Sequence, residues 1–214
     1  MHELFVTTVA ASRNSELMAE AAQRAVRVSV LTDRAADSLS ETVTPQGIVA
    51  VCELVDVPLD VALLNDPAMV AVLVGVSDPG NAGTVTRVAD SAGASAVIFA
   101  GDTVDPHNGK CVRASTGSVF HLPIARARNT TAVFDACRAA GLTLVAADGH
   151  ASTDLTETDL GRPTAWVFGS EAHGLDAEIL DAVDEVVKVP IYGRAESLNL
   201  ATAAAVCLYA GRLR

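Results

Sequence analysis

From about Val70 onward, short apolar runs rich in β-branched residues alternate with segments whose apolar residues recur at helical spacing. This alternation is typical of βαβ units and predicts an α/β fold with a mostly parallel sheet. The expected strands are residues 70–76, 96–100, 119–124, 142–147, 165–168 and 185–189. The first expected helix has apolar residues at helical spacing, namely Val85, Val88, Ala89 and Ala92. The others cover residues 130–140 and 175–183 and an alanine-rich stretch at 198–213.

The amino-acid composition limits which class of protein this chain can belong to. Half of the 214 residues are hydrophobic, and charged residues interrupt each apolar run well before the roughly 18 apolar residues that a membrane span requires. We therefore expect a soluble globular protein with no membrane association. The first residues include the acidic Glu3 and lack the basic start of a signal peptide, which favours a cytoplasmic location.

The net charge is −11, from 26 acidic and 15 basic residues. This acidic balance argues against nucleic-acid binding, since nucleic-acid-binding proteins usually present a basic face. The net charge is an average, however, and the charges are unevenly distributed along the chain. No acid occurs between Asp105 and Asp135, a stretch that contains four basic residues. We expect RNA phosphates to contact this stretch, through Lys110, Arg113, Arg126 and Arg128.

Cysteine and histidine spacing gives no sign of a metal site. No C-x-x-C pair occurs, and the five histidines show no H-E-x-x-H or other ligand spacing, so no metal is predicted. The cysteines are expected to be reduced and mostly buried, because a free cysteine behaves as a small hydrophobe. They are Cys52, Cys111, Cys137 and Cys207.

The chain is expected to divide into two domains. Residues 1–54 have a different pattern, with strand-like runs at 4–9, 26–31 and 47–52 and a helical segment near 14–25. Residues 55–67 are rich in proline, aspartate and asparagine and are expected to be a linker. Residues 68–214 then form the main domain.

Three polar, glycine-containing stretches follow expected strands, which is where open α/β sheets form ligand sites. They are residues 77–87, 167–175 and 189–200. The first stretch suggests a phosphate cradle but lacks both G-x-G-x-x-G and G-x-x-x-x-G-K-[ST], so neither a dinucleotide nor an NTP site is indicated. Ordinary structural roles remain possible for three of these residues. Arg87 could be a solvated helix residue, Glu171 an acid in the first turn of a helix, and Ser197 a helix N-cap.

In chain order these stretches read D-P-G-N-x-G-x-x-x-R, F-G-S-E-x-x-G-L and V-P-I-Y-G-x-x-E-S-L-N-L-A-x-A. Together they resemble the three motifs of the SpoU (TrmH-like) RNA 2′-O-ribose methyltransferases of the SPOUT superfamily. The stretch R-A-S-T-G-S at residues 113–118 resembles a basic segment of the same family. The resemblance extends from about Val70 to Arg214.

The resemblance implies a fold that periodicity does not predict, a C-terminal trefoil knot, because knots are almost excluded by general rules of topology. It also implies S-adenosylmethionine as cofactor, held in the knot largely by backbone groups. The family acts as a homodimer with the RNA site across the interface, and the alanine-rich last helix suits close packing. The implied cofactor contacts are Gly169, Ser170, Val189, Ile191, Leu198 and Leu200.

The resemblance further implies catalytic roles. A ribose 2′-hydroxyl is a weak nucleophile until it is deprotonated or polarised, so activation and placement are both needed. By motif match Arg87 is the base or activator, positioned together with the ribose by Asn81, Glu171, Ser197 and Asn199. An arginine is effectively always protonated, which favours a guanidinium that binds phosphate or stabilises the forming alkoxide.

Residues 1–54 resemble the second half of the ribosomal-protein-like RNA-binding domain of many relatives, above all at residues 40–52. Relatives usually carry a basic helical segment before this half, so a reduced or truncated domain is expected. The whole chain favours ribosomal RNA as substrate. Alternatives are a transfer RNA methyltransferase, an inactive RNA-binding SPOUT protein, and a small-molecule enzyme with a nucleotide cofactor, which would need a signature that we do not find.

Overall fold

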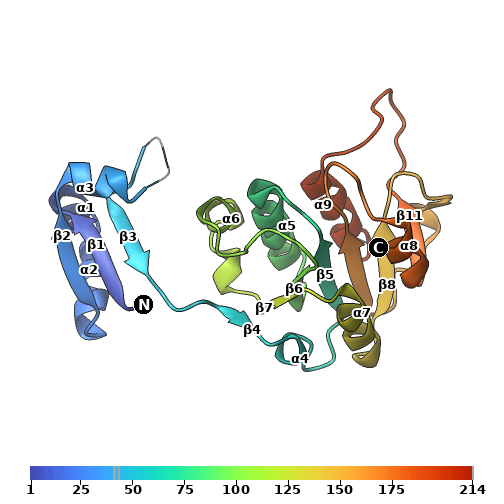
Figure 1. The fold of residues 1–214 in the computed structure, drawn as a ribbon, viewed down its shortest axis with the longest axis horizontal. Coiled ribbons are helices and arrows are strands. Elements are labelled where there is room, and N and C mark those ends of the chain that lie inside the picture. The colour runs from blue at the N-terminus through green and yellow to red at the C-terminus, as the bar shows by residue number, and fades with distance from the viewer. Residues whose placement is uncertain (41, 43, 214) are drawn as a thin grey trace. The chain divides into compact units, whose positions relative to one another are not determined.

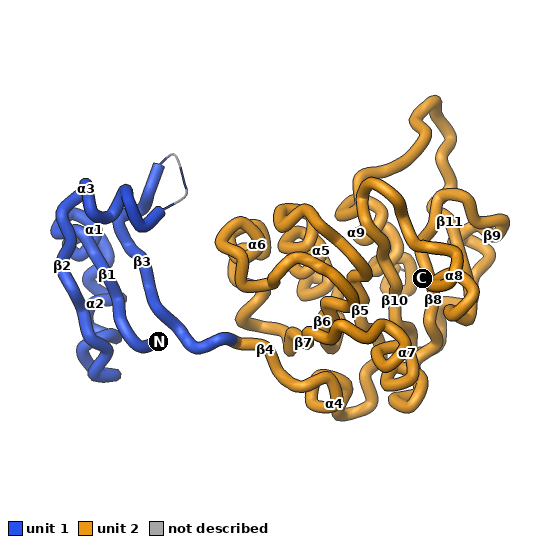
Figure 2. The backbone as a smooth tube through the Cα atoms, in the orientation of Figure 1, with its two compact units in different colours: residues 1–54 blue, residues 55–214 orange. Residues whose placement is uncertain are grey.

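The computed structural model describes residues 1–40, 42 and 44–213. These residues form two compact units, Met1–Leu54 and Val55–Arg214 (Figure 2). No helix in the described ranges is long and apolar enough to cross a membrane.

The first unit contains a small mixed sheet. In its described part the strand order is β2-β1-β3, with β1 parallel to β2 and antiparallel to β3. Leu4 and Val6 of the central strand are buried, and Thr7 ends that strand by capping the next helix through its side chain. The elements are β1 (Glu3–Thr7), α1 (Thr8–Arg13), α2 (Ser15–Gln23), β2 (Arg27–Leu31), α3 (Asp33–Ser38) and β3 (Ile48–Val51).

The second unit alternates strands with helices along most of its length. Its elements are β4 (Asp56–Val57), α4 (Leu59–Ala62), β5 (Met69–Val74), α5 (Pro79–Ser91), β6 (Ala96–Ala100), α6 (Gly109–Ser115), the 3-10 helix η1 (Ser118–Phe120), β7 (Ile124–Ala127), α7 (Thr130–Ala139), β8 (Thr143–Ala147), β9 (Thr153–Asp154), the 3-10 helix η2 (Leu155–Glu157), β10 (Thr164–Phe168), α8 (Ala177–Ala182), β11 (Glu185–Lys188) and α9 (Leu200–Ala210).

These described strands form one sheet in the order β4-β7-β6-β5-β10-β8-β11-β9, and every pairing within it is parallel. Helices α5, α6 and α9 pack on one face, and α4, α7 and α8 on the other (Figure 1). The expected α/β fold with a mostly parallel sheet is confirmed. Because β5 and β10 are adjacent and parallel, the stretches that follow them leave the same edge of the sheet.

The central strands are apolar throughout because helices cover both of their faces. In β5, Met69, Ala71 and Leu73 pack into the core under α5 and α9, whereas Val70 and Val72 pack into the core under α4 and α7. All five are at most 6% exposed. Alternate residues of the strand face opposite sides of the sheet, and the apolar run is continuous because both sides are buried.

Helix α9 returns across the sheet after the edge-side strand β11 and packs against α5, β10 and β8. Ala201, Ala204, Cys207 and Leu208 are buried within the unit. The small side chains of this helix thus serve close packing inside the chain, while Val206 is among its exposed residues. The trefoil knot implied for this part of the chain stays a prediction.

Two expectations about local structure were wrong. The expected strand at 119–124 is mostly η1 followed by a turn, and strand pairing starts only at Ile124. Gly117 enters this turn with φ +100°, a conformation that interrupts an extended chain. Ser197 is not the N-cap of the last helix: α9 starts at Leu200, and the Asn199 side chain accepts hydrogen bonds from the amides of its first turn.

Residues 55–67 contain regular structure that belongs to the second unit. Strand β4 pairs with β7, and Ala62 and Leu63 are buried against the sheet face that α7 covers. The backbone amide of Val55 donates to Nε2 of His107 at 3.3 Å. Regular structure therefore begins in this unit well before Ala68.

Candidate active site

The first motif is the start of a helix. Asp78 is the N-cap of α5 and accepts a hydrogen bond from the Asn81 amide at 2.8 Å, while Pro79 occupies the first turn. Both features are standard at helix N-termini, because the first amides lack partners within the helix. The cap fixes where the helix begins and thereby places the Asn81 side chain directly after β5.

The second glycine of this motif, Gly83, permits close packing of α5 on α6. A Cβ at this position would lie 2.2 Å from the carbonyl oxygen of Cys111 and 2.7 Å from the Ala114 side chain. Only hydrogen fits at such an approach of two backbones. The glycine therefore brings α6, with Lys110 in its first turn, next to the start of α5.

The second motif forms a closed turn after β10. Ser170 and Gly174 bridge each other through two backbone hydrogen bonds of 3.0 Å, and the Ser170 hydroxyl accepts from the His173 amide. Gly174 has φ +67°, and a Cβ on Gly169 would lie 2.4 Å from the Gly174 carbonyl oxygen. Both glycines are needed for a turn this tight, and the turn carries Glu171.

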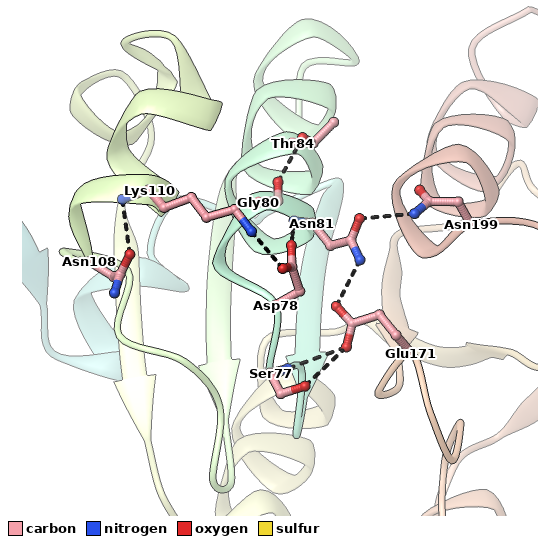
Figure 3. A network of polar contacts seen from close by, with 9 residues as sticks. All are labelled: Ser77, Asp78, Gly80, Asn81, Thr84, Asn108, Lys110, Glu171 and Asn199. Carbon is pink, nitrogen blue, oxygen red and sulfur yellow. Dashed lines mark hydrogen bonds and ion pairs between the residues drawn. The ribbon is translucent and has the colours of Figure 1, made fainter. Parts of the chain in front are cut away.

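The three motifs meet in one polar network (Figure 3). Nδ2 of Asn81 donates to Oε1 of Glu171 at 2.9 Å, and Oδ1 of Asn81 accepts from Nδ2 of Asn199 at 3.0 Å. The amide and hydroxyl of Ser77 lie 3.4 and 3.5 Å from Oε2 of Glu171. The side chains come from the starts of α5 and α9 and from the turn after β10. We call these four residues, Ser77, Asn81, Glu171 and Asn199, the amide-carboxylate network.

The network fixes the orientation of each amide. Asn81 must present its NH₂ group to a carboxylate and its oxygen to Asn199, whose own oxygen accepts from the amides of Ala201 and Thr202. Each donor and acceptor is thereby assigned by its partner. The side chains are therefore held in place before any ligand arrives.

Asp78 and Lys110 form an ion pair beside the network, with Nζ 2.7 Å from Oδ2. The hydrogen bond from Lys110, together with that from the Asn81 amide, holds the pKa of Asp78 below its ordinary value. Lys110, expected to contact RNA, is thus already engaged with a carboxylate at the start of α5.

Arg87 is placed differently. It lies six residues after Asn81 on α5, and its exposed side chain makes no ion pair or hydrogen bond with any residue that the structure describes. Ser197 likewise lies outside the network and is exposed. Of the five expected catalytic residues, the structure joins Asn81, Glu171 and Asn199 and leaves Arg87 and Ser197 apart from them.

The expected cofactor residues fall into a rigid and an open group. Gly169 and Ser170 belong to the bridged turn, and Val189 and Leu200 pack against the core. Between the last two, residues 191–199 are all exposed, and no backbone group from 190 to 198 bonds to another described residue. Ile191 and Leu198 remain 39% and 38% exposed. We call residues 190–198 the open segment.

The remaining expected RNA contacts are exposed. Arg126 lies 3.6 Å from a carboxylate oxygen of Asp105, while Arg113 and Arg128 have no ion pair within the described ranges. Ser77 and Asp78 were missed as site residues. Both stand inside the first motif, directly after a strand and before a proline at a helix start, and that capping pattern could have identified them.

An all-parallel α/β sheet with three polar motifs converging after β5, after β10 and before α9 defines an α/β protein with a polar site at the carboxyl ends of its central strands. The chain belongs to the SpoU rRNA Methylase family, which matches residues 68–209. Residues 1–57 match the substrate-binding domain of RNA 2′-O ribose methyltransferases.

Curated relatives carry related activities. The chain is 37% identical over 184 residues to the 23S rRNA (guanosine(2553)-2′-O)-methyltransferase RlmP of Bacillus subtilis, covering 86% of this chain and 72% of the relative. It is 32% identical to the 23S rRNA (guanosine-2′-O-)-methyltransferase RlmB of Bordetella pertussis, covering 97% of this chain and 86% of the relative.

Solved structures share the fold. The AdoMet-bound rRNA methyltransferase from Sinorhizobium meliloti matches with a TM-score of 0.87 and 33% identity, over 99% of this chain and 79% of that one. The SpoU methyltransferase AviRb from Streptomyces viridochromogenes, in complex with the cofactor AdoMet, matches with a TM-score of 0.85 and 33% identity, over 100% of this chain and 83% of that one.

Proposed function

We propose that this chain transfers the methyl group of S-adenosylmethionine to a ribose 2′-hydroxyl of ribosomal RNA, in 23S rRNA. The observation that carries the proposal is the amide-carboxylate network, because it brings one side chain or more from each family motif to a single edge of the sheet. Two relatives named as 23S rRNA methyltransferases are 37% and 32% identical to the chain, which supports the choice of substrate.

The residues present fit S-adenosylmethionine. The open segment offers backbone donors and acceptors that no described residue uses, as a ligand held by backbone groups requires. Ile191 and Leu198, partly exposed at the two ends of this segment, are suited to cover an apolar ring such as adenine. When bound, the cofactor supplies a methyl group made electrophilic by a positive sulfonium.

The amide-carboxylate network positions the ribose. Glu171 is an acceptor held by Asn81 and Ser77, so it can take a hydrogen bond from a ribose hydroxyl without moving. A nucleophile held in line with its target gains rate because the orientation is already fixed. The network therefore places the 2′-oxygen, and the proton that the hydroxyl loses on methylation is released to solvent water, so the network's side chains need not retain it.

Arg87 activates the hydroxyl electrostatically in this proposal. Its guanidinium has no partner in the described structure and is exposed on α5. A free guanidinium binds a phosphate through paired hydrogen bonds and stabilises a developing alkoxide, while its own proton stays bound. Ser197, at the end of the open segment, is proposed to contact the substrate when that segment closes on its ligand.

The other expected partners remain proposals. We propose that residues 1–54 bind the substrate RNA, which the match of residues 1–57 to a substrate-binding domain supports. We also propose that two copies pair to complete the RNA site, which size-exclusion chromatography with light scattering would test. We propose a cytoplasmic location, which a ribosomal substrate would require.

The test uses the full chain, tritiated S-adenosylmethionine and protein-free 23S rRNA, with transfer RNA as the comparison substrate. We expect ribose methylation at one site in 23S rRNA and none in transfer RNA, mapped by resistance of the modified linkage to alkaline hydrolysis. Calorimetry with S-adenosylmethionine and S-adenosylhomocysteine accompanies it. Failure to bind either compound would overturn the proposal.

A further inference from the structure

An exposed aromatic ring stands on the same side of the sheet as α5 and α6. Phe120 ends η1 with 61% of its surface exposed, although its neighbours Ser118 and Val119 are buried. The turn beneath it is rigid, because the Phe120 amide donates to Gly117 at 2.9 Å and the His121 amide to Ser118 at 3.0 Å. The ring is therefore held outward by a turn that is anchored in the core.

The next residue is also fixed. Nδ1 of His121 lies 2.8 Å from Oδ2 of Asp90 near the end of α5, and Ser118 also hydrogen-bonds that carboxylate. Nε2 of His121 is left without a partner among the residues described, and the side chain is 63% exposed. One edge of the imidazole is thus available to a ligand beside the phenyl ring.

Two free cations flank this position. Arg87 precedes Asp90 by three residues, which puts both on the same side of α5. Arg113 lies in the last turn of α6, just before the turn that leads to Phe120. Neither guanidinium has an ion pair within the described ranges, whereas Asp90 is already paired with His121. The surroundings of the ring are therefore net basic, in a chain of net charge −11.

We propose that Phe120 stacks on an unpaired base of the substrate RNA, with His121 and Arg113 contacting the adjoining phosphates, and this rests on the proposed function. Aromatic rings beside cations bind single-stranded RNA because every base has a π face and every linkage a phosphate. Nine residues separate Asn81 from Asp90, about 14 Å along α5 at 1.5 Å per residue. The stacked base therefore belongs to a nucleotide flanking the methylated one, and Arg87 lies between the two.

Charge complementarity favours RNA over a protein partner on this surface. A protein that covered Phe120 would have to leave Arg113 and His121 without compensation or bring acids to them, whereas one RNA strand supplies both a stacking face and phosphates. A second copy of this chain, which is acidic overall, is an outcome that the test distinguishes.

The test compares Phe120→Ala, Phe120→Leu and Phe120→Trp in the full chain. The binding probe is a fluorescein-labelled single-stranded RNA of mixed sequence, and 23S rRNA methylation is followed under single-turnover conditions. We expect Phe120→Ala and Phe120→Leu to weaken RNA binding about 10-fold to 100-fold and Phe120→Trp to retain it. Arg113→Ala should weaken binding and reduce its salt dependence. The matched control is Leu64→Ala, since Leu64 is 59% exposed yet lies outside this surface, and it should bind as the wild type does.

Affinity for S-adenosylmethionine, measured by calorimetry, should be unchanged in every variant, which shows that each is folded. If the wild type binds the cofactor and methylates RNA but Phe120→Leu binds RNA normally, stacking is wrong while the proposed function stands. If the wild type does neither, the proposed function itself fails. A change in molecular mass of Phe120→Ala, with unaltered RNA affinity, would assign the surface to contacts between copies and overturn the proposal.

Discussion

The amide-carboxylate network and the open segment both lie in the family motifs, yet they differ in how they are held. In the network each polar atom has a named partner within the chain, at 2.9 to 3.5 Å. In the open segment the backbone has none among the described residues, and residues 191–198 are exposed throughout. The first region is organised by folding and the second is available to a ligand.

The rigid network and the open segment suit two different tasks, positioning a nucleophile and admitting a cofactor. A group that positions a nucleophile has to be rigid before the reaction, because reorganisation during the reaction costs rate. A group that admits and releases a cofactor has to open. Arg87 belongs with the open segment in this respect, since its guanidinium also lacks a described partner.

Substitution of Arg87 has the largest expected effect. Arg87→Ala and Arg87→Lys should lower the single-turnover methylation rate about 100-fold to 1,000-fold, because both remove the forked donor that we propose for the developing alkoxide. Cofactor affinity by calorimetry should not change, since the guanidinium is outside the open segment. Methylation by Arg87→Ala at nearly the wild-type rate would remove the free arginine from the mechanism.

Substitution of Gly169 tests whether the rigid turn is needed. In Gly169→Ala the added Cβ would lie 2.4 Å from the Gly174 carbonyl oxygen, so the turn that carries Glu171 must shift. We expect a loss of about 1 to 3 kcal/mol in the free energy of unfolding, measured in urea, together with slower methylation. Gly149→Ala is the control, because nothing lies within 4 Å of a Cβ there. Equal stability of the two variants would contradict the tight turn.

Asn81→Ala tests the network itself. The change removes one hydrogen bond to Glu171 and one from Asn199. In this partly exposed position each contributes about 0.5 to 1.5 kcal/mol to the free energy of unfolding. Unfolding in urea should show a coupling between Asn81→Ala and Glu171→Ala, because both substitutions break the same contact. Additive losses from the two substitutions would show that the contact does not contribute to stability.

Lys110→Ala should have the smallest effect, and that effect should depend on pH. Lys110 holds the pKa of Asp78 below its ordinary value, so this ion pair stabilises the fold above the unfolded-state pKa. The advantage of the wild type should be complete at neutral pH and disappear as the pH falls through the folded-state pKa of Asp78. NMR titration of the Asp78 carboxyl in both proteins checks this, and an unchanged pKa in the variant would contradict it.

Sequence patterns predicted the layer architecture because burial on both faces of a parallel sheet leaves long apolar runs, as in β5 and β6. The prediction of a strand at residues 119–124 was wrong because a short apolar run does not distinguish a strand from a 3-10 turn. The positive φ of Gly117 ends the extended chain before this run, and that φ depends on the surrounding fold.

The candidate site divides in the same way. The positions of the stretches after strands predicted a ligand site there, and the resemblance to the family assigned Asn81 and Glu171 to one site. The reasons for Gly83 and Gly169 could not be predicted, because they are approaches to the backbone of Cys111 and Gly174 that only the packed structure reveals. Asn199 was expected in the first turn of the last helix and proved to be its cap.

The network also has a consequence for when the enzyme becomes active. Its contacts join Asn81 to Glu171, 90 residues on, and to Asn199, 118 residues on. Contacts at such separations form late, because long loops must close before they are gained. A polypeptide still being synthesised lacks α9 and cannot assemble the network until that helix has been made. The site therefore matures only after nearly all of the domain has been translated, and an unfinished copy lacks the complete network that we propose to hold the ribose.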